Sequence, residues 1–117
     1  MLNKRQKGTE GEDIAVKYLE SKGYRIIQRN YRFERNEIDI IAEYGNMLVF
    51  IEVKARRSKE FGDPEDSVTL KKRARIRATA EGYLYEKRID DRGCRFDVIA
   101  IEYIDNNTEI RHIENAF

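Results

Sequence analysis

The sequence has very little cysteine, proline or tryptophan, and it contains no long apolar run. Cys94 is the only cysteine among 117 residues, Pro64 is the only proline, and tryptophan is absent. A single cysteine excludes an intramolecular disulfide and a zinc site built from several cysteines, as is typical of proteins in a reducing cytoplasm. Because the N-terminal residues are polar and no apolar segment reaches membrane-spanning length, we expect a cytoplasmic protein with neither secretory signal nor membrane anchor.

Charged residues are abundant, but neither sign dominates. They make up 38% of the chain against 40% for apolar residues, and the formal net charge is only +1. This composition is typical of a globular protein rather than a disordered chain. A nucleic-acid partner therefore has to be argued from local clusters of cations and not from overall charge. At this length we predict one domain spanning residues 1–117.

The order of apolar patterns predicts an α/β fold. A first helix is expected to begin at Thr9, where Thr9 and Glu12 match a capping box, and to stop at Gly23. A run of helical spacing predicts a second helix, and residues rich in β-branched side chains predict five strands. The order αβββαββ predicts helices that flank a mixed sheet. The predicted strands are 24–31, 37–44, 47–55, 94–104 and a short one within 108–117, with the second helix at 69–86 and a loop at 56–67.

The segment "EIDIIAEYGNMLVFIEVK", residues 37–54, has the pattern of a hairpin around a Gly-Asn turn. A two-residue turn with glycine first places Asp39 opposite Glu52 and Glu37 opposite Lys54. These four charged side chains then project from one face, at the open end of the hairpin. The other face is entirely apolar and has to be covered, most simply by a helix. Its residues are Ile38, Ile40, Ala42, Val49, Ile51 and Val53.

Two directly opposed carboxylates repel each other, so the sequence raises the question of what offsets the repulsion. Lys54 is one candidate and a divalent metal is a better one, because Mg²⁺ prefers one or two carboxylates together with waters and substrate phosphate. Beside such a metal, Lys54 would stabilise negative charge on a phosphate or lower the pKa of an attacking water. The plain alternative is a surface ladder of ion pairs, including Glu37 with Lys54, that contributes at most ~1 kcal/mol.

Glu12 has two competing interpretations. It shares a helical face with Ala15 and Leu19, so it is expected to point toward the sheet, where it would serve as a third acidic ligand. A glutamate in the third position of a capping box needs no metal, however. Both interpretations stay open on the sequence alone.

Two basic clusters, "KARRSK" and "KKRARIR", lie close in sequence to the acidic segment. A solvated helix face is the ordinary explanation of such runs, but a phosphate backbone that approaches an acidic site needs cations to hold it. We therefore predict nucleic-acid contacts for Lys72, Arg75, Arg56 and Arg57.

Three further residues suggest structure rather than chemistry. Asp97 lies in a strand and is expected to be a buried partner for Arg95. His112 is a lone histidine and Cys94 a lone cysteine, so we expect neither a metal ligand nor a nucleophile there.

The chain resembles known nuclease families. Asp39, a gap of twelve residues and then Glu52-Val53-Lys54 resemble the PD-(D/E)xK signature, although Ile38 replaces the proline of the general pattern. The helix with an inward glutamate and the element order look like the archaeal Holliday-junction resolvase branch. More closely, the chain resembles the YraN-like family of small bacterial proteins, which are predicted endonucleases. The resemblance spans "GEDIAVKYLESKGY", "RNYRFERNEIDII", "LVFIEVKAR", "FGDPEDSV", "RFDVIAI" and "HIENAF".

This resemblance implies a restriction-endonuclease-like αβββαβ core and hydrolysis of DNA phosphodiester bonds with Mg²⁺ or Mn²⁺. By the same resemblance Glu12, Asp39 and Glu52 would bind metal and Lys54 would be catalytic. Double-stranded or branched DNA would be the partner, and a homodimer is expected by analogy with the resolvases. Two rival functions remain: a non-catalytic nucleic-acid-binding module on the same fold, and an interaction or scaffold protein.

Overall fold

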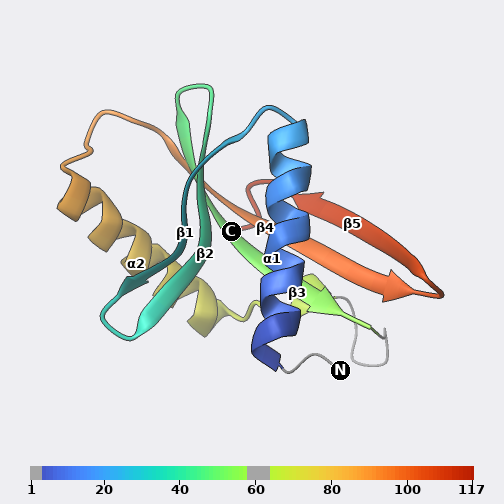
Figure 1. Cartoon of the computed structure of the whole chain (residues 1–117). Coiled ribbons are helices and arrows are strands. Elements are labelled where there is room, and N and C mark those ends of the chain that lie inside the picture. Colours follow the sequence, from blue (N-terminus) through green and yellow to red (C-terminus); the bar gives the residue numbers. More distant parts are fainter. Residues whose placement is uncertain (1–3, 58–63) are drawn as a thin grey trace.

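The computed structural model describes residues 4–57 and 64–117, and it confirms the predicted α/β class (Figure 1). Five strands form a single mixed sheet with one long helix on each face. The elements are α1 (Lys4–Ser21), β1 (Arg25–Phe33), β2 (Asn36–Tyr44), β3 (Met47–Arg56), the short 3₁₀ helix η1 (Pro64–Ser67), α2 (Leu70–Lys87), β4 (Cys94–Ile104) and β5 (Asn107–Ile113).

The strands lie in the sheet in the same order as in the chain, from β1 to β5. Neighbouring strands are antiparallel except for β3 and β4, which are parallel. Parallel neighbours need a long crossover, and α2 supplies it between β3 and β4. Within the described ranges, neither helix is long and apolar enough to cross a membrane. The predicted loop is in part replaced by the end of β3 and by η1, and its residues 58–63 lie outside the described part of the chain.

Each face of the sheet has its own apolar core. α1 crosses one face (Figure 1), where its side chains pack on alternate residues of β2, β3 and β4. α2 covers the other face near β1 and β2. The α1 core consists of Ala15, Leu19, Tyr24, Ile40, Ala42, Val49, Ile51, Ile99 and Ile101. The α2 core consists of Tyr31, Ile38, Ile41, Leu48, Phe50, Val68, Ile76, Ala80, Tyr83 and Val98.

The helix starts show one success and one error of the sequence analysis. Thr69 is the N-cap of α2, and its side chain accepts a hydrogen bond from the backbone N–H of Lys72 at 3.2 Å. The capping box predicted for α1 is wrong, because the helix begins at Lys4 and Thr9 is therefore an interior helical residue. The preceding lysines, arginine and glutamine are good helix formers, and they extend α1 past the predicted start.

The predicted hairpin register is confirmed as far as the pairing extends. Tyr44 pairs with Met47 and Ile40 with Ile51, and the first turn residue, Gly45, has a φ of +60°. Ile38 was predicted to share one face of the hairpin with Ile40, but it packs in the α2 core, whereas Ile40 packs in the α1 core. The physical reason is an interruption of the alternation at Asp39. The pairing of β1 with β2 skips Asn30 and Asp39, and Asn30 has a positive φ of 53°.

Candidate functional site

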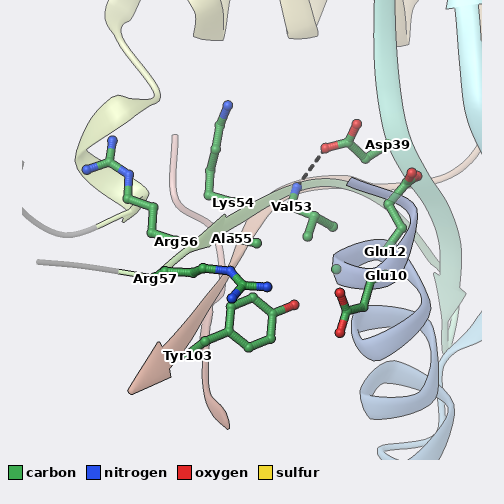
Figure 2. A pocket seen from close by; sticks show the side chains of 10 residues that line it. Glu10, Glu12, Asp39, Val53, Lys54, Ala55, Arg56, Arg57 and Tyr103 are labelled. Carbon is green, nitrogen blue, oxygen red and sulfur yellow. Dashed lines mark hydrogen bonds between the residues drawn. The ribbon is translucent and has the colours of Figure 1, made fainter. Parts of the chain in front are cut away.

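The candidate site lies where β2 and β3 part. After the last paired residues, Ile40 and Ile51, β3 continues alongside β4 alone. Asp39 then takes the place of a main-chain partner, and its Oδ2 accepts a hydrogen bond from the backbone N–H of Val53 at 2.8 Å (Figure 2). Asp39 and Glu52 are consequently not a paired couple in the ladder, but they stand at the first positions past its end. We call this place the fork.

The charged form of Asp39 is disfavoured at the fork. Burial raises the pKa of its carboxyl group, the negative charges of Glu52 and Glu12 raise it further, and the Val53 N–H opposes them only in part. The result is a pKa of about 8. Near neutral pH this carboxyl group therefore needs either a proton or an added positive charge, which is the behaviour expected of a functional rather than a structural carboxylate.

Two lysines approach Glu52, which is buried with 7% of its surface exposed. Lys54 Nζ lies 3.6 Å from Glu52 Oε1, and Lys72 Nζ from the first turn of α2 lies 3.3 Å from the same oxygen. The predicted pair of Glu37 with Lys54 is wrong, because the strands have already parted there. Glu37 instead faces Arg32 on β1, at 3.5 Å.

The pKa values of the two lysines shift in opposite directions. Burial and the neighbouring Lys72 lower the pKa of Lys54, although Glu52 and Asp39 act in the opposite direction. Burial also acts to lower the pKa of Lys72, but its contact with Lys54 and the charge of Glu52 outweigh burial and raise it. Lys54 is thus the more readily deprotonated of the pair.

Glu12 points from α1 toward the sheet, as its helical face predicted, since Ala15 and Leu19 on that face are fully buried. Burial raises the pKa of its carboxyl group. With its amide nitrogen turned to the acids, Asn30 donates to Glu12 Oε1 at 2.9 Å and to Glu37 Oε1 at 2.8 Å. In the described part of the chain no three His, Cys, Asp or Glu side chains are grouped closely enough to hold a metal ion together.

Two cavities open on either side of the fork. The first, of about 520 Å³, lies on the α1 side, and we call it the α1 cavity. The second, of about 380 Å³, lies beside the start of α2, and we call it the α2 groove. The α1 cavity is lined by Glu10, Gly11, Glu12, Asp39, Val53, Lys54, Ala55, Arg56, Arg57 and Tyr103. The α2 groove is lined by Arg35, Asn36, Glu37, Thr69, Lys71, Lys72, Arg75 and Ile76.

The predicted nucleic-acid contacts are divided between these cavities. Lys72 and Arg75 line the α2 groove, whereas Arg56 and Arg57 line the α1 cavity. In the α1 cavity the guanidinium of Arg57 lies over the ring of Tyr103, 5.7 Å from its centroid (Figure 2). Sequence reasoning missed Tyr103, although its spacing from Ile99 and Ile101 on β4 would have placed it on the α1 face.

The network around Asp97 is separate from the fork. Asp97 is fully buried, and Arg95 contacts both of its oxygens, at 2.9 and 2.7 Å, as predicted. His112 Nε2 lies 2.7 Å from Asp97 Oδ2, and the backbone N–H of Asn115 donates to Oδ1. These contacts tie the C-terminal segment to β4, which is a structural role.

Comparisons with known proteins extend over the whole site. The model of a family described as "Uncharacterised protein family UPF0102" matches residues 11–101, a span that includes the fork. A UPF0102 protein of Alkaliphilus oremlandii is 48% identical over 112 residues, which cover 94% of this chain and 96% of the relative. A relative from a Sulfurihydrogenibium species is 46% identical over 116 residues, covering 99% and 97%. One from Clostridioides difficile is 42% identical over 116 residues, covering 99% and 100%.

Proposed function

The chain belongs to the uncharacterised protein family UPF0102, and from this premise and the geometry of the fork we propose that it hydrolyses phosphodiester bonds in DNA with a divalent cation. The observation that carries this proposal is the pair formed by Asp39 and Glu52, in which Asp39 has a pKa of about 8. The two lysines contact Glu52, and Asp39 still keeps its proton near neutral pH, so a cation that contacts Asp39 would take the place of that proton. We also place the chain, as part of the same proposal, in the PD-(D/E)xK superfamily.

The residues at the fork fit Mg²⁺ or Mn²⁺ in charge and in donor chemistry. Asp39 and Glu52 are hard oxygen donors from two different strands, and Mg²⁺ is usually bound by one or two carboxylates that leave room for waters and phosphate. The burial of Asp39 beside a second carboxylate supports this fit, because a cation relieves both the desolvation and the repulsion. Glu12 lies near enough for its charge to be felt by Asp39, and in the proposal it acts on the metal through water rather than as a third direct ligand.

In the proposed mechanism the cation, when bound, would supply Lewis-acid activation of a water molecule and neutralise charge on the phosphoryl oxygens. The chain's own residues hold the reacting groups. The Val53 N–H fixes the orientation of the Asp39 carboxylate. Lys54, whose Nζ lies beside Glu52, donates to the developing negative charge on the phosphate or positions the attacking water. Lys72 contacts the same oxygen of Glu52 and restrains this carboxylate.

The α2 groove supplies the contact surface for the DNA backbone. Four of its lining residues are cations, Arg35, Lys71, Lys72 and Arg75, against the single carboxylate Glu37. Cations gathered beside a carboxylate pair are what a phosphate backbone needs to approach an otherwise acidic site. This support is local and does not require a basic protein overall.

One observation favours a second candidate, a nucleic-acid-binding module that does not cleave. Glu52 is contacted by both Lys54 and Lys72, so two cations already compensate the charge that a metal would compensate. If these ion pairs persist when DNA binds, the protein would hold DNA through the α2 groove without hydrolysing it.

A nuclease screen distinguishes the two candidates. Linear, flapped and branched DNA would be incubated with the protein in Mg²⁺, Mn²⁺ or EDTA, and the same screen run with Asp39→Asn. Glu109→Gln, an exposed carboxylate change on the edge strand β5, is the control. The proposal expects cleavage that needs metal, is lost in Asp39→Asn and persists in Glu109→Gln. DNA binding without cleavage of any substrate would favour the binding module.

A further inference from the structure

The two cavities beside the fork differ in charge. The α1 cavity is lined by three carboxylates, Glu10, Glu12 and Asp39, and by three cations, Lys54, Arg56 and Arg57. Because the ammonium group of Lys54 is directed to Glu52 instead, the α1 cavity has no excess of positive charge. The α2 groove has four cations and one carboxylate, an excess of three positive charges. A phosphate backbone is attracted to the second and gains little from the first. The α1 cavity therefore suits a different part of a nucleic acid.

The volume and the lining of the α1 cavity fit a group of limited size. Its volume of about 520 Å³ lies in the range of pockets that enclose small molecules, and a DNA duplex cannot enter it. Apolar atoms of Val53 and Ala55 form part of its wall. Gly11 allows α1 to approach closely, since a Cβ there would already lie 3.3 Å from the Cβ of Ala55.

Tyr103 lines the α1 cavity and is half-buried. Its hydroxyl oxygen is hidden from solvent and has no hydrogen-bond partner among the described residues, so the exposed part of its side chain is the ring. The guanidinium of Arg57, which also lines the α1 cavity, lies over this ring (Figure 2). An aromatic face and a guanidinium plane are the two surfaces on which proteins stack unpaired bases.

We propose that the α1 cavity binds an unpaired nucleobase, which stacks on Tyr103 while the adjacent phosphate lies at the fork. The inference rests on the proposed function, and it adds a substrate class: DNA with an extrahelical or single-stranded nucleotide at the cleavage position. Arg57 shifts along the ring to admit the base. Glu10, whose carboxylate lies on the Tyr103 side of the cavity (Figure 2), accepts a hydrogen bond from an exocyclic amino group such as that of cytosine.

Lys54 and Tyr103 lie on different sides of β3, and this supports a base and a phosphate bound on different sides of the strand (Figure 2). Lys54 projects from β3 to the side opposite Tyr103 (Figure 2), toward Glu52 and Lys72. A strand that crosses the fork would thus have its base on the α1 side, its phosphate between Asp39 and Lys54, and its continuing backbone in the α2 groove. Duplex DNA can place its backbone there, but it cannot fill the α1 cavity unless a base leaves the stack.

The test compares two DNA duplexes that have the same bulge and the same charge. One carries an extra cytidine, and the other carries an abasic residue at the same position. Binding would be measured by fluorescence anisotropy in EDTA, so that cleavage does not interfere, with wild type, Tyr103→Phe and Tyr103→Leu. Tyr103→Phe retains the ring and removes only a hydroxyl without a partner in the described structure. Tyr85→Ala, on an exposed and remote part of α2, is the second control.

We expect wild type to bind the cytidine bulge about tenfold more tightly than the abasic bulge, which is the scale of one stacked base. Tyr103→Phe and Tyr85→Ala should keep this preference, and Tyr103→Leu should lose it. Equal binding of the two bulges by wild type would overturn the inference without any variant, and so would a preference that survives Tyr103→Leu. If metal-dependent cleavage were seen alongside equal binding, only this inference would fail. The absence of any DNA binding would overturn the proposed function as well.

Discussion

Asp39→Asn should make the metal-free protein more stable at neutral and alkaline pH, and should leave its stability unchanged only below the ordinary pKa of an aspartate. Asparagine has the same shape, and its side-chain oxygen can still accept the hydrogen bond from Val53. The substitution therefore removes the charge at the fork and little else. In the folded protein the pKa of Asp39 is about 8, above the ordinary value of 3.8.

The sign follows from proton linkage. Between these two pKa values the folded state binds the Asp39 proton and the unfolded state does not, so the free energy of unfolding falls as pH rises toward 8. Each unit of pKa difference corresponds to about 1.36 kcal/mol, which sets an upper limit of roughly 6 kcal/mol. Because Asp39 is only partly buried, solvent screens its charge, and we expect about 2 kcal/mol of this to be measured.

The assay is urea or thermal denaturation in EDTA at several pH values from 3 to 9, with Glu109→Gln as the matched control. Wild type and Asp39→Asn should agree near pH 3, below both pKa values, whereas near pH 9 the variant should melt several degrees higher. The reasoning would be refuted by parallel pH profiles, or by a variant that is less stable than wild type at pH 9. The latter result would mean that the carboxylate stabilises the fold as an ordinary ion-pair partner.

Three other predictions concern the fork, the α2 groove and the packing of α2. Mg²⁺ or Mn²⁺ at a hundredfold excess over its dissociation constant should stabilise wild type by about 2.7 kcal/mol in thermal melts, and should not stabilise Asp39→Asn; an equal shift in both would place the metal elsewhere. Lys72→Ala combined with Arg75→Ala should reduce the log–log salt slope of duplex binding by about 2, since each phosphate contact contributes about 0.9; an unchanged slope would show that this helix face is merely solvated. Gly82→Ala should destabilise the fold by about 1–3 kcal/mol in urea denaturation, because a Cβ there would lie 2.6 Å from the ring of Phe33; a neutral result would mean that the ring moves freely.

The sequence predicted the parts of the site that depend on local pattern. A two-residue turn and a period of two are enough to define the register of Tyr44 with Met47 and of Ile40 with Ile51. They are also enough to bring Asp39 and Glu52 to the same end of the hairpin. The pattern does not show where the alternation of a strand is interrupted, as it is at Asp39 beside Asn30. For this reason Ile38 was assigned to the same face as Ile40.

Contacts between elements distant in sequence were harder to predict. Lys72 was predicted as a phosphate contact, but its ion pair with Glu52 depends on how the start of α2 packs beside β3. The capping box predicted at Thr9 was wrong for a related reason. The same four-residue pattern occurs at helix starts and inside helices, and the preceding residues decide whether the helix begins there or earlier. The α1 cavity required three elements to be placed together, α1, β3 and β4, and no local pattern describes that.

The hydrogen bond from Val53 to Asp39 makes the Val53 amide a probe of the charge on the Asp39 carboxyl group. The amide proton of Val53 is held by a side chain that gains or loses charge, where its neighbours toward the turn are held by peptide carbonyls. Its exchange rate and its NMR frequency should therefore follow the protonation of Asp39, whereas amides nearer the turn, such as that of Val49, should not respond. One resonance, observed without substrate and without mutation, would report whether the carboxylate at the fork is neutral, ionised or engaged by a cation.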